Sequence, residues 1–98
     1  MITIRKLASL PRKTRLRKMA VILEDMERDC HRGGTVDARY LREMARLLTD
    51  DERIDDRVRG AALRAADVAD EADTLCRTID ALRHALLARI GRLPAEWD

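Results

Sequence analysis

An uninterrupted apolar repeat in the second half of this 98-residue chain constrains its fold more than any other feature. Apolar residues recur there at alternating steps of four and three, a spacing that places all of them on one side of an α-helix. The repeat therefore predicts an all-α fold. Its members are Ile54, Val58, Ala61, Ala65, Val68, Ala72, Leu75, Ile79, Leu82 and Leu86.

A single helix over residues 51–91 would be about 60 Å long, which exceeds the width of a domain of this size. The repeat is therefore compatible with one helix that extends to meet a partner, or with two stacked helices. Gly60 and the polar stretch 70–73 are the places where a break is expected. Gly91 and Pro94 end the helical pattern, so residues 92–98 are expected to form an extended tail.

Three shorter helices are expected before the repeat, at residues 1–10, 11–32 and 35–49. Pro11 suits the first turn of the second, and the pair Gly33-Gly34 ends it. Thr35 or Asp37 caps the third, and the acidic cluster 50–52 both ends it and starts the next helix. We predict a single domain: a small bundle of three to five helices with one long C-terminal helix or helical hairpin. The apolar stripe of the second helix is Leu16, Met19, Ala20, Leu23, Met26 and Cys30.

Composition argues against several classes of protein. No apolar run approaches the roughly 18 to 20 residues of a membrane span, and no signal-peptide pattern is found, so a cytoplasmic location is expected. Cys30 and Cys76 do not make a disulfide framework and are expected to be buried reduced thiols. Neither zinc-ligand pairs nor a calcium-loop spacing occurs. Because no acid-base pair, nucleophile or metal set stands out, we expect no enzyme, cofactor, metal or small-molecule substrate.

Charge is unevenly distributed along the chain. Residues 1–23 carry seven basic and no acidic side chains, whereas the other 75 residues carry 13 basic and 18 acidic ones. Guanidinium groups suit phosphate oxygens, so an RNA or DNA backbone is the first candidate partner. Pairing with acidic clusters of the same molecule or of another protein is the alternative, and a membrane surface is less favoured because bulky exposed apolar residues are lacking. The seven are Arg5, Lys6, Arg12, Lys13, Arg15, Arg17 and Lys18.

Three short segments resemble the helical N-terminal region found ahead of some bacterial SpoU/TrmH-type RNA methyltransferases. They are 4–10 (IRKLASL), 14–18 (TRLRK) and 94–98 (PAEWD), and together they cover under a fifth of the chain. In that family a separate knotted α/β domain binds S-adenosylmethionine. The chain has no Asn and no strand-rich segment, so no catalytic or cofactor residue carries over. The resemblance implies a substrate-handling extension whose basic helix contacts tRNA or rRNA.

Two functional hypotheses follow. The first is a non-catalytic cytoplasmic module that binds structured RNA through the seven N-terminal cations and assists an RNA-modifying enzyme. The second is a protein-interaction or oligomerisation module that docks, or self-associates, through the apolar repeat at every position except Ala72. Without exposed aromatic side chains, binding to RNA would use the backbone and shape rather than base stacking.

Overall fold

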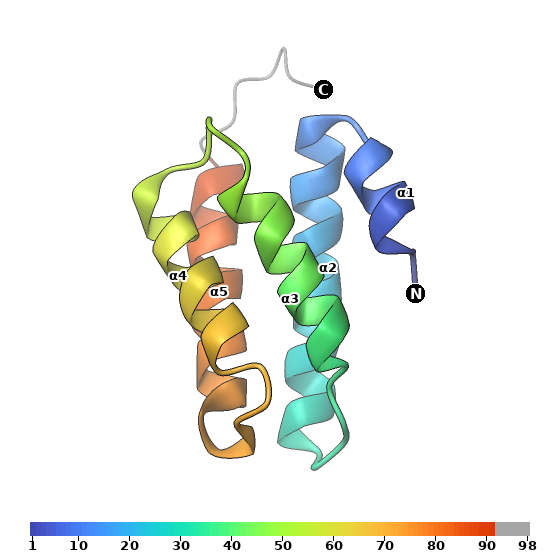
Figure 1. The fold of residues 1–98 in the computed structure, drawn as a ribbon, viewed down its shortest axis with the longest axis vertical. Coiled ribbons are helices and arrows are strands. Elements are labelled where there is room, and N and C mark those ends of the chain that lie inside the picture. The colour runs from blue at the N-terminus through green and yellow to red at the C-terminus, as the bar shows by residue number, and fades with distance from the viewer. Residues whose placement is uncertain (92–98) are drawn as a thin grey trace.

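The computed structural model describes residues 1–91, which form five α-helices and no strand (Figure 1). This confirms the predicted small all-α bundle. The predicted tail, residues 92–98, lies outside the described residues. The helices are α1 (Ile4–Ser9), α2 (Arg12–His31), α3 (Ala38–Thr49), α4 (Asp56–Asp67) and α5 (Ala72–Ile90).

Helices α2 to α5 alternate in direction and lie lengthwise, while the short α1 packs against α2 and α3 (Figure 1). The closest neighbours are α2 with α5, α3 with α4, and α4 with α5. The core between them is aliphatic, as a chain without Phe requires. The fully buried large side chains are Leu7, Leu16, Met19, Leu23, Leu41, Met44, Leu48, Val58, Ile79, Leu82 and Leu86.

Local signals mark the end of α2 and the start of α3. Gly33 has a φ of 77°, a left-handed conformation that glycine adopts without a side-chain clash. The Gly34 N–H donates to the Asp29 carbonyl at 2.8 Å, which ends α2 where the sequence predicts. Of the two candidate caps for α3, Asp37 is used: its carboxylate accepts the Tyr40 N–H at 3.0 Å.

The acidic cluster 50–52 ends α3 as expected, but the prediction that it starts the next helix is wrong. The Asp51 carboxylate accepts the Arg53 N–H at 2.9 Å and so stabilises a turn. The cap of α4 is Asp55, whose carboxylate accepts the Val58 N–H at 2.9 Å. Short acidic side chains satisfy free N–H groups equally well in turns and at helix starts, so the sequence alone favoured the wrong carboxylate.

The apolar repeat forms a helical hairpin and not one long helix. Residues 68–71 make a turn in which the Glu71 N–H donates to the Val68 carbonyl at 2.8 Å. The break therefore falls at the predicted polar stretch, while Gly60 stays helical. Folding the repeat back lets its two halves bury each other's apolar face within one small bundle.

The buried face of α4 differs from the predicted seam. Ala61 and Val68 are partly exposed, and Ala62 and Ala69 are buried in their place. The reason is that α4 packs against α3 as well as α5, so its buried face lies between the two contacts. Ala72, in the first turn of α5, is exposed.

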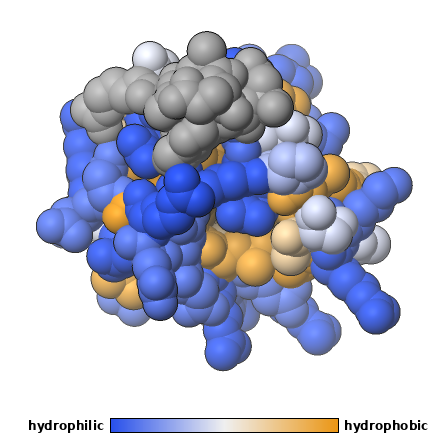
Figure 2. Space-filling model, turned by 90° about the horizontal axis from the view of Figure 1, so that it is seen from above, coloured by the Kyte–Doolittle hydropathy of each residue, from blue (hydrophilic) through white to orange (hydrophobic). Residues whose placement is uncertain are grey.

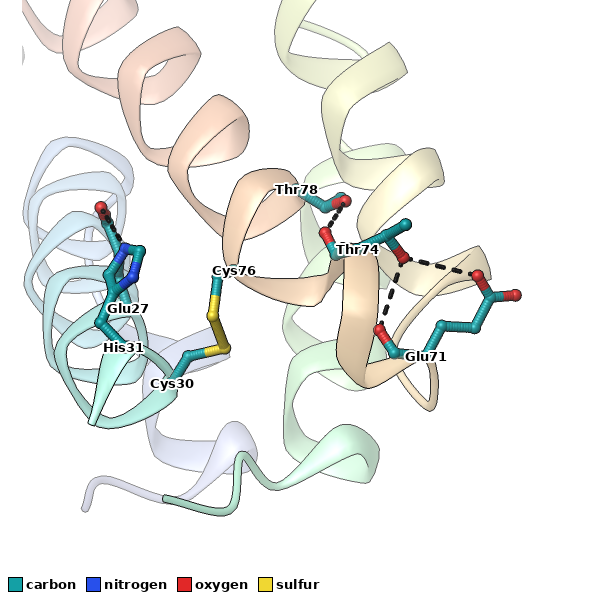
Figure 3. Close-up of a disulfide and its surroundings, with 7 residues drawn as sticks. All are labelled: Glu27, Cys30, His31, Glu71, Thr74, Cys76 and Thr78. Atoms are coloured by element: carbon teal, nitrogen blue, oxygen red, sulfur yellow. Dashed lines mark hydrogen bonds and ion pairs between the residues drawn. A yellow bond between two sulfur atoms is a disulfide. The ribbon is translucent and has the colours of Figure 1, made fainter. Parts of the chain in front are cut away.

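The cysteines are disulfide-bonded, so the prediction of reduced thiols is wrong. Cys30, at the end of α2, is bonded to Cys76, near the start of α5, with 5.7 Å between their Cα atoms (Figure 3). The residues are 46 apart in sequence. They meet because α2 and α5 run in opposite directions side by side, a tertiary arrangement that no spacing rule reveals. Each cysteine is half-buried, so neither is the fully enclosed core thiol expected.

Candidate nucleic-acid interface

The seven N-terminal cations lie on α1 and on the first two turns of α2, at the upper end of the bundle in Figure 1. The structure separates them into two sets. Four side chains are exposed, and three are buried or half-buried. The exposed set consists of Arg5, Lys6, Arg17 and Lys18.

Two of the seven, Arg12 and Arg15, are held by an acidic side chain of the same molecule. The Arg12 Nε donates to Asp51 Oδ2 at 2.8 Å, and the exposed fractions of the two side chains are 13% and 11%. Arg15 Nη2 lies 3.9 Å from the same oxygen, and its Nη1 donates to the Leu10 carbonyl at 3.4 Å. These two cations therefore pair with an acidic cluster of the same molecule, which was the alternative to RNA binding. The pairing links the start of α2 to the turn before α4.

Lys13 is also unavailable to a polyanion, because it is only 5% exposed. Lys13 lies three residues before Leu16, on the same face of α2, and is buried with it. Long side chains commonly bury their aliphatic stem in this way, and helical spacing alone does not show which neighbouring elements cover it. The predicted set of seven phosphate contacts is thus reduced to four.

The four exposed cations belong to α1 and to the first turns of α2, at an end of the molecule where hydrophilic side chains predominate. Figure 2 views the molecule from this end and shows apolar atoms only in patches between hydrophilic ones. Among the described residues, Arg5, Lys6 and Lys18 form no ion pair with a carboxylate. No carboxylate in residues 1–91 therefore neutralises their charge, which leaves these three cations available for phosphate contacts.

A hollow of about 360 Å³ lies beside this end, but its lining does not suit a phosphate. Arg15 and Arg53 contribute positive charge there, while the cluster 50–52 contributes three carboxylates. Phosphate would be repelled by those carboxylates. Any polyanion is therefore expected at the exposed cations of α1 and α2 and not in this hollow.

The apolar repeat belongs to the molecule's own core. Of its nine predicted interface positions, seven are buried, so a second protein cannot reach them without unfolding the bundle. Only Ala61 and Val68 keep partial exposure. The prediction that the repeat forms an interface with another molecule is therefore wrong, because the repeat packs within its own bundle. The seven are Ile54, Val58, Ala65, Leu75, Ile79, Leu82 and Leu86.

A second set of arginines, which the sequence did not point to, lies on the outer side of the α4–α5 hairpin. Arg57 and Arg64 of α4 and Arg77 of α5 line one groove of about 630 Å³, together with Gly60. Their sequence signal was a pair of arginines seven residues apart on either side of a mid-helix glycine. It was obscured by the general abundance of arginine in the chain.

Other ionic contacts join the helices without forming a chemical centre. Arg83 Nε donates to Glu27 Oε2 at 2.7 Å and links α5 to α2. This hydrogen bond raises the pKa of Arg83. His31 lies 3.6 Å from Glu27 and His84 lies 3.5 Å from Asp80, both within one helix (Figure 3 draws the first). Within residues 1–91 no three metal-ligating side chains form a group, and no helix has the length and apolar character of a membrane span.

No family model, curated protein or solved structure matches this chain. The resemblance to the N-terminal region of SpoU/TrmH-type methyltransferases therefore stays a prediction.

Proposed function

We propose that this chain is a non-catalytic helical module that binds structured RNA through the exposed cations of α1 and α2. The observation that carries the proposal is the set Arg5, Lys6, Arg17 and Lys18, exposed on a segment without any carboxylate. Each guanidinium or ammonium group that neutralises a phosphate releases a counterion, which favours binding to a nucleic-acid backbone. Contacts would be made to phosphate and shape, because the described exposed surface offers no aromatic ring for base stacking.

The reduced set of cations changes the expected strength of the interaction. With four phosphate contacts, log K should fall against log salt with a slope of about −3 to −4, not the −5 to −6 of seven contacts. Arg12 and Arg15 are excluded from this count because Asp51 holds them. Binding should thus be clear at low salt and weak at physiological salt.

Fluorescence anisotropy with tRNA, beside a DNA duplex of equal length and over a salt series, tests the proposal. The variant Arg5→Glu/Lys6→Glu/Lys18→Glu should lower the salt slope by about two to three units. Arg57→Glu/Arg64→Glu/Arg77→Glu is the matched control, since it changes net charge equally at the α4–α5 groove. An unchanged RNA affinity and slope in the first variant would contradict the proposal.

The assisting role beside an RNA-modifying enzyme rests only on the resemblance of residues 4–10, 14–18 and 94–98. The expected cytoplasmic location conflicts with the Cys30–Cys76 disulfide, because such bonds persist mainly in oxidising compartments. Alkylation of Cys30 and Cys76 in freshly lysed cells, detected by mass spectrometry, decides between a cytoplasmic location and an oxidising compartment. Labelled cysteines would favour the cytoplasm, and unlabelled cysteines an oxidising compartment.

A protein-interaction function is kept as the second candidate, but on a different surface from the one the sequence favoured. The apolar repeat no longer supports it, since most of the repeat is in the core. The groove on the outer side of α4 and α5 now supports a protein-interaction function, because three arginines and several small residues line it.

A further inference from the structure

The outer side of the α4–α5 hairpin carries a continuous groove. One part, of about 630 Å³, lies along Gly60 and Ala61 of α4 and Ala81 and Ala85 of α5. A second hollow of about 440 Å³ continues the groove towards the 68–71 turn, and Arg64 and Arg77 line both parts. The floor is made of small side chains, so a partner backbone can come close to both helices.

The rim of this groove carries positive charge that residues 1–91 do not neutralise. Among the described residues, Arg57, Arg64 and Arg77 form no ion pair. Two of the three carboxylates beside them are already engaged: Asp56 pairs with Arg59 at 3.5 Å, and Asp80 pairs with Arg83 at 3.3 Å. Three arginines therefore face a groove in which, within the described part of the chain, only the carboxylate of Asp67 is not paired with another cation.

Gly60 supports an outside partner independently of the charge. A glycine inside a helix destabilises it relative to alanine, because glycine loses more backbone conformational freedom on folding. Nothing within the molecule requires it, because a Cβ atom added at Gly60 would meet no other atom within 4 Å. The glycine leaves space at the floor of the groove, which a closely approaching backbone can use.

We propose that the α4–α5 groove docks an amphipathic helix of another protein, whose acidic side chains face Arg57, Arg64 and Arg77. The two α4 arginines are seven residues apart, about two helical turns, so acidic residues at positions i and i+7 of the partner helix match them. A polyanion such as RNA is less suited, because the small residues Gly60, Ala61 and Ala81 that line the groove fit the apolar face of a helix and offer no side-chain donor to a phosphate.

A second copy of this chain is not the occupant. Two α4 helices that cross antiparallel at Gly60 would bring Arg57 of one copy beside Arg64 of the other. Like charges at that distance oppose association. A foreign helix carrying carboxylates meets the same groove with complementary charge. The inference is independent of the proposed RNA contact on α1 and α2.

The probe is a synthetic helical peptide of about 20 residues with Glu at i and i+7 and Leu and Ala on the same face, labelled for anisotropy. Its control has the same composition, with the Glu residues moved to the opposite face. The full chain should bind the first peptide at least about tenfold more tightly than the second, with an affinity that falls as salt rises. If the probe does not bind at concentrations up to about 1 mM, the proposal is overturned.

Variants of the groove separate docking from folding and from RNA binding. Arg57→Glu/Arg64→Glu/Arg77→Glu should weaken peptide binding at least tenfold while leaving tRNA affinity unchanged, and Arg5→Glu/Lys6→Glu/Lys18→Glu should do the reverse. Gly60→Leu should weaken peptide binding by a similar factor. Gly60→Ala should raise Tm and yet still weaken peptide binding. Loss of tRNA affinity in the groove variant, or unchanged peptide affinity in Gly60→Leu, would refute docking at this groove.

Discussion

The two ends of the bundle are closed by different chemistry. At the lower end in Figure 1, the Cys30–Cys76 disulfide joins α2 to α5 covalently. At the upper end, the start of α2 is joined to the turn before α4 by Asp51, which accepts from Arg12 and lies near Arg15. A covalent bond constrains the unfolded chain as well as the folded one, whereas an ion pair acts only in the folded state. The ends should therefore differ in how strongly, and under what conditions, they stabilise the fold.

Removing the disulfide should have the largest effect. The bond closes a loop with a sequence separation of 46, for which loop-closure entropy gives about 4 kcal/mol. Cys30→Ser/Cys76→Ser, or reduction of the native chain, should lower the free energy of unfolding by about that amount, as measured by urea denaturation. Reductant should not change the stability of the double variant, and a loss below about 1 kcal/mol would show that the ends do not differ in this way.

Breaking the upper end should cost less. Asp51→Ala removes the acceptor of Arg12 and of the Arg53 N–H, and a partly buried charged hydrogen bond contributes about 2 kcal/mol. Urea denaturation should show this loss with little dependence on salt, since Asp51 is mostly shielded from solvent. The two ends are distant, so the losses in the combined disulfide and Asp51 variant should add. Clear non-additivity would mean that the ends are coupled.

The smallest effect is expected at the attachment of the N-terminus, where the Tyr40 hydroxyl donates to the Ile2 carbonyl at 2.7 Å. Tyr40→Phe should destabilise the chain by about 1 kcal/mol and increase hydrogen exchange in α1. Burial raises the pKa of Tyr40, so the stability linked to its neutral form is complete below about pH 10. It should be lost as pH rises through the raised pKa. The stability advantage of the native chain over the Phe variant should decrease at high pH, and a constant difference would contradict this.

Sequence periodicity predicted the local elements of this protein well, because helix formation depends on near neighbours. The α2 stripe, its end at Gly33-Gly34 and the hairpin break near residue 70 all depend on contacts within a few residues. Where two local signals were equivalent, the sequence did not show which one is used, and the predicted cap of α4 was wrong. Asp51 and Asp55 are chemically alike, and only the path of the chain after α3 decides which one caps a helix.

The candidate site was predicted only in part, for a related reason. The basic character of residues 1–23 is a property of composition, and it placed Arg5, Lys6, Arg17 and Lys18 at the surface correctly. That Lys13 is buried depends on what packs over the first turns of α2. The groove arginines came from two different helices, so no local pattern brought them together.

By itself, the sequence determined that the chain is helical, where most helices end, and that positive charge gathers at its N-terminus, since all three follow from residue spacing and identity. The tertiary structure decided what those features face. It turned the apolar repeat into a core, joined two cysteines that are far apart in sequence, and engaged part of the basic run with Asp51. The physical reason is that burial, disulfide bonding and ion pairing depend on distances between segments, which helical periodicity does not encode.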